Sequence, residues 1–262
     1  MQWNHNKIIR GNYFMRVEQL YKRNTHSWMV MGRDAERRHE VIDTNQYLVQ
    51  NNGKGMLLDP GGVENFSIVA AEFSKHFELA NVEAIFASHQ DPDVISSLPL
   101  WIQANPDLIV YMPKIWVSFI THFGVKLENI RPIPDEGGVI TLGGHDLDVV
   151  PAHYLHSSGN LSVYDPQAKI FFSGDIGAAL LPDDYTSLFV EDFDTHTQYM
   201  EYFHRRWMPS NTAKARWIAE VRKRDVAMLC PQHGAIFKGE DVARFLSWFE
   251  NLDVASGWSN VR

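Results

Sequence analysis

Residues 88–93 read SHQDPD and place one imidazole and two carboxylates within five consecutive positions. The segment follows the apolar run 82–87, which has the composition of a buried strand. Side chains on a loop that leaves a rigid strand can converge on one or two cations, and Pro92 stiffens this loop. His89, Asp91 and Asp93 are therefore candidate metal ligands.

Three later runs that read as strands lead into residues of the same kind, His153, Asp175 and His233. Functional side chains gather on loops at strand ends. Together with residues 88–93, these positions offer three imidazoles and three carboxylates, which suit two divalent ions with one carboxylate as a bridge. Each residue alone also fits an ordinary turn or surface position, so the prediction depends on the complete set.

Strand-like and helical patterns are interleaved along the chain. Apolar spacing predicts helices over residues 65–77, 95–103, 114–123, 195–207, 210–224 and 239–252. Strands mixed with helices favour an α/β fold of mixed sheets covered by helices. No Pro/Ser-rich linker interrupts the sequence, and residues 1–262 are expected to form a single domain.

Composition limits the partners. The formal net charge is -8, which argues against nucleic acid and gives no reason to expect an anionic membrane surface as a partner. Cys230 is the only cysteine, so no intrachain disulfide forms, as in a reducing compartment. The N-terminal residues lack a signal-peptide pattern, and no apolar stretch is long enough to span a bilayer. We expect a cytoplasmic protein.

The order of these residues resembles the metallo-β-lactamase superfamily. The motifs that carry the resemblance are SHQDPD, then His153, then FFSGD at residues 171–175, then PQHG at residues 231–234. The resemblance runs from about Asn45 to the last predicted helix. It implies a metallo-β-lactamase-type αββα sandwich of two mixed β-sheets flanked by helices.

Two positions depart from the hydrolases of that superfamily, which carry His-x-His-x-Asp-His. Asp91 stands where they have the second His, and Val94 where they have the last. The flavodiiron branch carries His-x-Glu-x-Asp, which this motif resembles with Asp for Glu. Exchanging an imidazole for a carboxylate makes a site harder and favours iron over zinc.

The resemblance implies two non-haem iron ions, with zinc as the alternative metal. Val94 leaves the second ion an open position for a gas or water. Tyr154 and His156 are candidates to contact bound oxygen without ligating a metal. The implied ligands are His89, Asp91 and His153 on one ion, Asp93 and His233 on the other, and Asp175 as the bridge.

Flavodiiron reductases carry a flavodoxin domain after the diiron domain, and no flavin phosphate loop follows the last predicted helix here. The chain therefore resembles the stand-alone oxygen-binding diiron proteins linked with chemotaxis. The resemblance implies a sensor that binds dioxygen, or nitric oxide, and meets a signalling or electron-donor protein. Any turnover would make it a slow oxidoreductase, and pairing into a homodimer is a further expectation.

Two other functions remain open from the sequence. The first is a binuclear zinc hydrolase acting on a lactone, thioester or phosphodiester through metal-bound hydroxide. The second is a metal-free interaction module. Asp91 and Val94 favour the diiron protein over the hydrolase, and the six ligand-type residues argue against the module.

Overall fold

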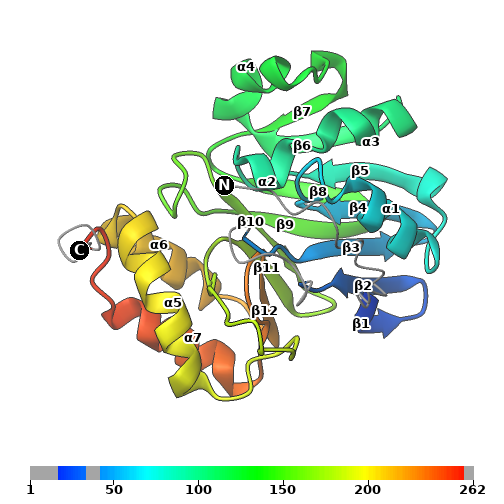
Figure 1. Cartoon of the computed structure of the whole chain (residues 1–262). Coiled ribbons are helices and arrows are strands. Elements are labelled where there is room, and N and C mark those ends of the chain that lie inside the picture. Colours follow the sequence, from blue (N-terminus) through cyan, green and yellow to red (C-terminus); the bar gives the residue numbers. More distant parts are fainter. Residues whose placement is uncertain (1–16, 34–41, 257–262) are drawn as a thin grey trace, which may run out of the picture.

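The computed structural model describes residues 17–33 and 42–256, and it forms four layers (Figure 1). Two β-sheets pack face to face, with helices on the outer side of each. This arrangement confirms the predicted αββα sandwich. No helix in the described part of the chain is long and apolar enough to cross a membrane. That residues 1–262 form one domain stays a prediction, because residues 1–16, 34–41 and 257–262 lie outside the described ranges.

The first sheet has the strand order β1-β2-β3-β4-β5-β6-β7. Strands β1 to β4 pair antiparallel, and β4 to β7 pair parallel. A turn at Asn52 and Gly53 joins β3 to β4, and both residues have positive φ, as a tight hairpin turn requires. The strands are β1 (Val17–Arg23), β2 (His26–Met31), β3 (Gln46–Asn51), β4 (Lys54–Leu58), β5 (Val82–Phe86), β6 (Ile109–Pro113) and β7 (Ile130–Ile133).

The second sheet has the order β13-β12-β11-β10-β9-β8. Its strands β8 to β11 pair antiparallel, whereas β11 and β12 pair parallel. The strands are β8 (Gly138–Leu142), β9 (His145–Pro151), β10 (Leu161–Asp165), β11 (Ile170–Gly174), β12 (Met228–Pro231) and β13 (Phe237–Lys238).

Helices cover the outer faces of the sheets. The helix predicted over 95–103 is observed mainly as α3, because α2 precedes it and ends at Ile95. The helix predicted over 114–123 is observed as α4 between two 3₁₀ turns. Ser210 caps α6 by accepting the amide of Ala213, as its position before the helix predicts. The helices are α1 (Phe66–Ser74), α2 (Pro92–Ile95), α3 (Leu98–Ala104), α4 (Val117–Ile120), α5 (Phe193–Trp207), α6 (Asn211–Val221) and α7 (Glu240–Asn251).

Alternation along β2 shows how the core is divided. Trp28 and Val30 point into the layer between the sheets, and Met29 and Met31 point toward the helices on the other face. Because both faces of each sheet are buried, strand register is tightly fixed. The loops after β5, β9, β11 and β12 therefore leave the sandwich from well-anchored strands, and these loops carry the candidate ligands.

Candidate metal centre

The loop after β5 begins with a buried hydrogen-bond chain. Asp59 accepts the amide and the hydroxyl of Ser88, at 2.7 and 2.6 Å. Because the Ser88 hydroxyl is committed to Asp59, Nδ1 of His89 donates to Ser88 Oγ at 2.8 Å. The other ring nitrogen, Nε2, then faces Asp91 and Asp175, each at 3.7 Å. Burial raises the pKa of Asp59 to about 7, against the opposing effects of His89 and Ser88.

Asp91 and Asp93 flank Pro92 at the start of α2, where proline at the first helical position is favoured. Burial opposes ionisation of Asp91, but the imidazoles of His156 and His89 beside it outweigh burial and hold the pKa of Asp91 below its usual range. Burial raises the pKa of Asp93 despite the attraction of a nearby histidine. The two carboxylates thus lie in different electrostatic surroundings.

The turn after β9 brings His156 to the centre. Tyr154 N donates to Ser157 O at 2.7 Å and Leu155 N donates to Ala152 O at 3.1 Å, so the chain reverses over these residues. Leu155 is fully buried and anchors the turn. Nε2 of His156 lies 3.1 Å from Oδ2 of Asp91 and 3.1 Å from Oδ2 of Asp175.

His153 differs from its predicted position. Its Nε2 lies 2.8 Å from the carbonyl oxygen of Asp135, to which it donates. With Tyr154, which is 55 % exposed, it lines a cleft of about 880 Å³ beside α6. The structure therefore does not bring His153 to the other five predicted ligands. His156, expected only to contact bound oxygen, occupies that place instead.

Asp175 and His233 complete the group from the second sheet. Asp175 follows Gly174, whose positive φ and close approach to Ser88 disfavour a side chain. His233 donates from Nδ1 to the carbonyl oxygen of Asp43 at 2.6 Å. Its Nε2 lies 3.3 Å from Asp93 Oδ2 and 3.5 Å from Asp175 Oδ1. Each imidazole is thereby turned with Nε2 toward the carboxylates.

The six side chains have the charge and the spacing of a cation site. Burial alone would lower the pKa values of His156 and His233, yet Asp175 and its neighbouring carboxylates raise them to about 10 and about 9. The same negative potential attracts metal ions. The imidazole–carboxylate separations of 3.1 to 3.7 Å match those of ligands that share a cation at about 2 Å.

Two buried atoms support this interpretation. Among the described residues, His156 Nε2 and Asp175 Oδ1 form no hydrogen bond although solvent does not reach them. Buried polar atoms are nearly always satisfied, so an exception calls for a further partner such as an ion. His89, His156 and Asp175 offer ligand atoms that all lie within 4.8 Å of one another. The residues therefore fit metal ions.

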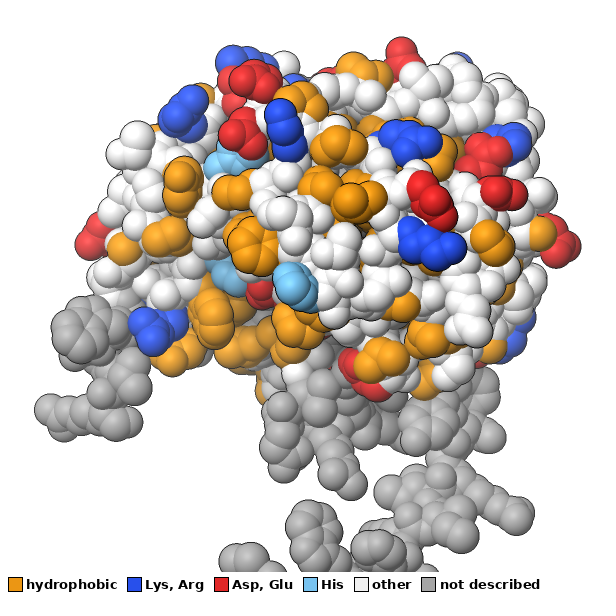
Figure 2. Space-filling view, turned by 90° about the horizontal axis from the view of Figure 1, so that it is seen from above, with side chains coloured by type: hydrophobic (Ala, Val, Ile, Leu, Met, Phe, Trp, Pro, Cys, Tyr) orange, Lys and Arg blue, Asp and Glu red, His pale blue; other side chains and the backbone are white. Residues whose placement is uncertain are grey.

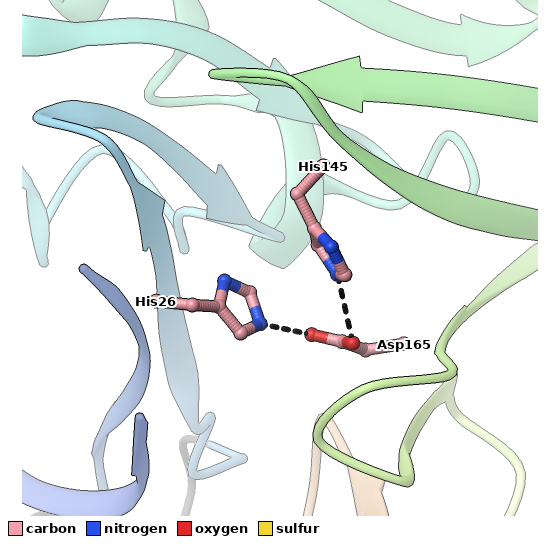
Figure 3. Close-up of side chains that lie close together, drawn as sticks. All are labelled: His26, His145 and Asp165. Carbon is pink, nitrogen blue, oxygen red and sulfur yellow. Dashed lines mark hydrogen bonds and ion pairs between the residues drawn. The ribbon is translucent and has the colours of Figure 1, made fainter. Parts of the chain in front are cut away.

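A second histidine–aspartate cluster has a different character (Figure 3). Asp165 contacts His26 Nε2 at 2.6 Å, Trp28 Nε1 at 2.6 Å and His145 Nε2 at 2.9 Å. Its Oδ1 also accepts two backbone amides of its own turn. Five donors saturate this buried carboxylate, and the short direct contacts leave no space for an ion. We interpret the cluster as a clasp between the two sheets, although its residue types alone also suit a metal.

Aromatic side chains cover the outer side of the centre. The His156 ring contacts Trp207 with ring centroids 5.6 Å apart and Phe203 at 6.3 Å, both from α5. Trp207 is half exposed. Figure 2 shows that hydrophobic side chains lie next to the histidine side chains visible on that face of the molecule. His156 thus has aromatic side chains of α5 on one side and the carboxylates of Asp91 and Asp175 on the other.

The fold and these six side chains define a metal-binding protein of the metallo-β-lactamase type. A family model described as the ODP family of β-lactamases matches residues 42–234. The chain belongs to this family.

Solved structures show the same likeness. The chain is similar to the peroxy diiron species of the chemotaxis sensor ODP, with 38 % identity and a TM-score of 0.83 over 93 % of this chain and 97 % of that one. The apo state of the chemotaxis sensor ODP from T. denticola matches with the same values. A flavo di-iron protein variant from Thermotoga maritima, with 21 % identity and a TM-score of 0.76 over 90 % of this chain and 60 % of that one, shares the fold.

Curated relatives are more distant. An uncharacterized protein from Methanocaldococcus jannaschii is 23 % identical over 79 % of this chain and 53 % of its own length. Diflavin flavoprotein A 1 from Synechocystis sp. is 24 % identical over 80 % of this chain and 37 % of its own length. The chain thus spans about half the length, or less, of these relatives.

Proposed function

We propose that this chain binds dioxygen at a two-iron centre and acts as an oxygen sensor. The observation that carries the proposal is the convergence of three imidazoles and three carboxylates from four loops. Asp175 Oδ1 and His156 Nε2 are buried there and have no hydrogen bond among the described residues. The likeness to a chemotaxis sensor whose structure was solved as a peroxy diiron species supports it.

The contacts favour two groups of ligands that share Asp175. One group lies on the side of His156, and the other lies on the side of His233. The proposed ligands are His89, Asp91 and His156 for the first iron, Asp93 and His233 for the second, and Asp175 between them. This set keeps the predicted division and replaces His153 by His156.

Iron is favoured by the donor set. Three carboxylates with three imidazoles make a harder site than the histidine-rich site of the hydrolases. Val94 is fully buried in the apolar cluster beneath α2 and supplies no ligand, so the second iron has fewer protein ligands than the first. When bound, a ferrous pair supplies an open position and electrons for a diatomic gas. The protein's part is to hold the six ligand atoms and exclude bulk water with Phe203 and Trp207.

Further parts of the proposal concern partners. Dioxygen is the proposed ligand and nitric oxide the competing one. A signalling or electron-donor protein is the expected macromolecular partner, since a sensor must pass on its state. The single, buried cysteine agrees with action in the cytoplasm. A homodimer remains a prediction.

Metal content and a gas-dependent spectrum test this function. We expect two irons per chain after anaerobic expression in iron-rich medium, and a new visible charge-transfer band when air is admitted. A chain that takes up two zinc ions instead and turns over a lactone, thioester or phosphodiester would overturn the proposal. Exchange of His233 for Ala should remove one iron and the band; a variant that keeps both would refute the ligand assignment.

A further inference from the structure

The side chain of Gln90 bridges the two loops that supply the first metal position. Its amide nitrogen donates to Oδ1 of Asp91 at 2.9 Å. Its amide oxygen accepts the hydroxyl of Ser157 at 2.5 Å. Ser157 directly follows His156, so one amide group connects the neighbours of two proposed ligands. Neither the motif resemblance nor the proposed function assigns a role to Gln90.

The Asp91 side chain has few other contacts that would hold its orientation. It stands immediately before α2, where an aspartate side chain normally accepts a backbone amide of the first turn. Within the described residues, Asp91 makes no such capping bond. Its side chain also keeps 28 % exposure, so packing alone does not fix it. The hydrogen bond from Gln90 holds Oδ1, while Oδ2 faces His156 and His89.

We propose that Gln90 is the positioning residue of the first metal site, holding Asp91 so that only Oδ2 is offered to the ion. The inference rests on the proposed function. The Asp91 carboxylate, which can only accept, fixes the orientation of the Gln90 amide with its NH₂ group toward Asp91, and Ser157 donates to the Oε1 at the other end. A reversed amide would set Oε1 against the carboxylate and repel it.

Gln232 provides an internal comparison. It precedes His233 and points toward Asp93, much as Gln90 follows His89 and points toward Asp91. Its contact with Asp93 Oδ2 is long, 3.4 Å, and its own Oε1 has no hydrogen-bond partner among the described residues. Gln90, with short bonds at both ends of the amide, is the more firmly fixed of the two.

The first experiment titrates metal-free protein with Fe(II) under anaerobic conditions and resolves the two binding steps. Removing an outer hydrogen bond to a ligand commonly lowers metal affinity by about 10- to 100-fold. We expect Gln90→Ala to weaken the step assigned to His89, Asp91 and His156 by a factor in that range and to change the other step by less than about threefold. Gln103→Ala, on the exposed face of α3, is the matched control and should behave as wild type.

The second experiment separates positioning from a structural role. Ser157→Ala removes one of the two bonds that hold the Gln90 amide and leaves its bond to Asp91 in place, so its effect on the first step should be smaller than that of Gln90→Ala. The double variant should be no weaker than Gln90→Ala alone. The thermal midpoint of each metal-free variant checks that the loops still fold.

Equal Fe(II) affinities for Gln90→Ala and wild type at both steps would overturn the positioning role. A loss divided evenly between the steps, or fully additive effects of Gln90→Ala and Ser157→Ala, would do so too. Failure of the wild-type chain to bind two Fe(II) ions would instead refute the proposed function, so the two failures are distinguishable.

Discussion

Replacing Asp165 by Asn tests whether the clasp between the sheets is built from hydrogen bonds. The carboxylate is fully buried, with two donors on Oδ2 and three on Oδ1. An Asn side chain must set its NH₂ group against one of these sets, so at least two donors lose their acceptor. The charge facing His26 is lost as well.

The magnitude follows from these contacts. Each buried donor left unsatisfied costs about 1–3 kcal/mol. Two such donors therefore cost about 2–6 kcal/mol together. We expect Asp165→Asn to lower the free energy of unfolding by about 4 kcal/mol, with the same loss in the presence and absence of a metal chelator.

Urea denaturation of the metal-free protein, followed by tryptophan fluorescence, measures this loss. Asp146→Asn is the matched control, because Asp146 is exposed and accepts a single hydroxyl from Thr141. Its effect should stay within about 0.5 kcal/mol. A loss below about 1 kcal/mol for Asp165→Asn would show that the donors find other partners. A loss that appears only when metal is available would show that the cluster binds an ion, against our interpretation.

Three further predictions concern histidines and metal. His156→Ala should lose one iron while His153→Ala keeps both, as metal analysis of the purified variants will show; the opposite result would restore His153 as the ligand. Burial lowers the pKa of His204 to about 4, below the value of about 6.5 in an unfolded chain, so stability is intact above pH 6.5 and falls as pH drops toward 4. His204→Gln should make the decline of the urea midpoint over that window shallower, and an unchanged slope would contradict the assignment. Fe(II) at 100 times its dissociation constant should raise the free energy of unfolding by about 2.7 kcal/mol, and a chelator should reverse this; an iron-independent urea midpoint would contradict a folded-state site.

The sequence predicts a candidate ligand well where it lies close to the end of a strand. His89 comes three residues after β5, Asp175 comes directly after β11, and His233 comes two residues after β12. A short connection to the strand leaves the ligand side chain few possible directions. The strand predicted from the sequence therefore also predicts where the ligand lies. The buried sheets then bring these strand ends together, and the spacing of apolar residues predicts those sheets.

The prediction of His153 is not supported because a turn intervenes. β9 ends at Pro151, and the next residues reverse direction through Tyr154, which has positive φ. Burial of Leu155 sets which histidine faces the carboxylates. The sequence offers two histidines three positions apart, and no periodic pattern extends through the turn to distinguish them. The nearest signal is Leu155 itself, an apolar anchor beside His156.

The sequence does not predict the clasp around Asp165, for a related reason. His26 and Asp165 are 139 positions apart and lie on different sheets, so only the packing of the two sheets brings them together. His26 and His145 belong to no motif, which by itself favours a role in the fold or on the surface. Their residue types are those of the metal centre, which means that composition alone does not separate a structural cluster from a functional one.

The difference between the two clusters lies in how far each satisfies itself. Asp165 is saturated by five donors at hydrogen-bond distance, so the clasp is complete without any addition and contributes stability. Asp175 is as deeply buried, yet its Oδ1 has no hydrogen bond among the described residues, and its contacts with His89 and His233 are 3.7 and 3.5 Å long. Burial without satisfaction is unfavourable, so the fold has retained an arrangement that only an added cation completes. This unfilled requirement, rather than the count of histidines and aspartates, is the physical ground for assigning function to the group around Asp175.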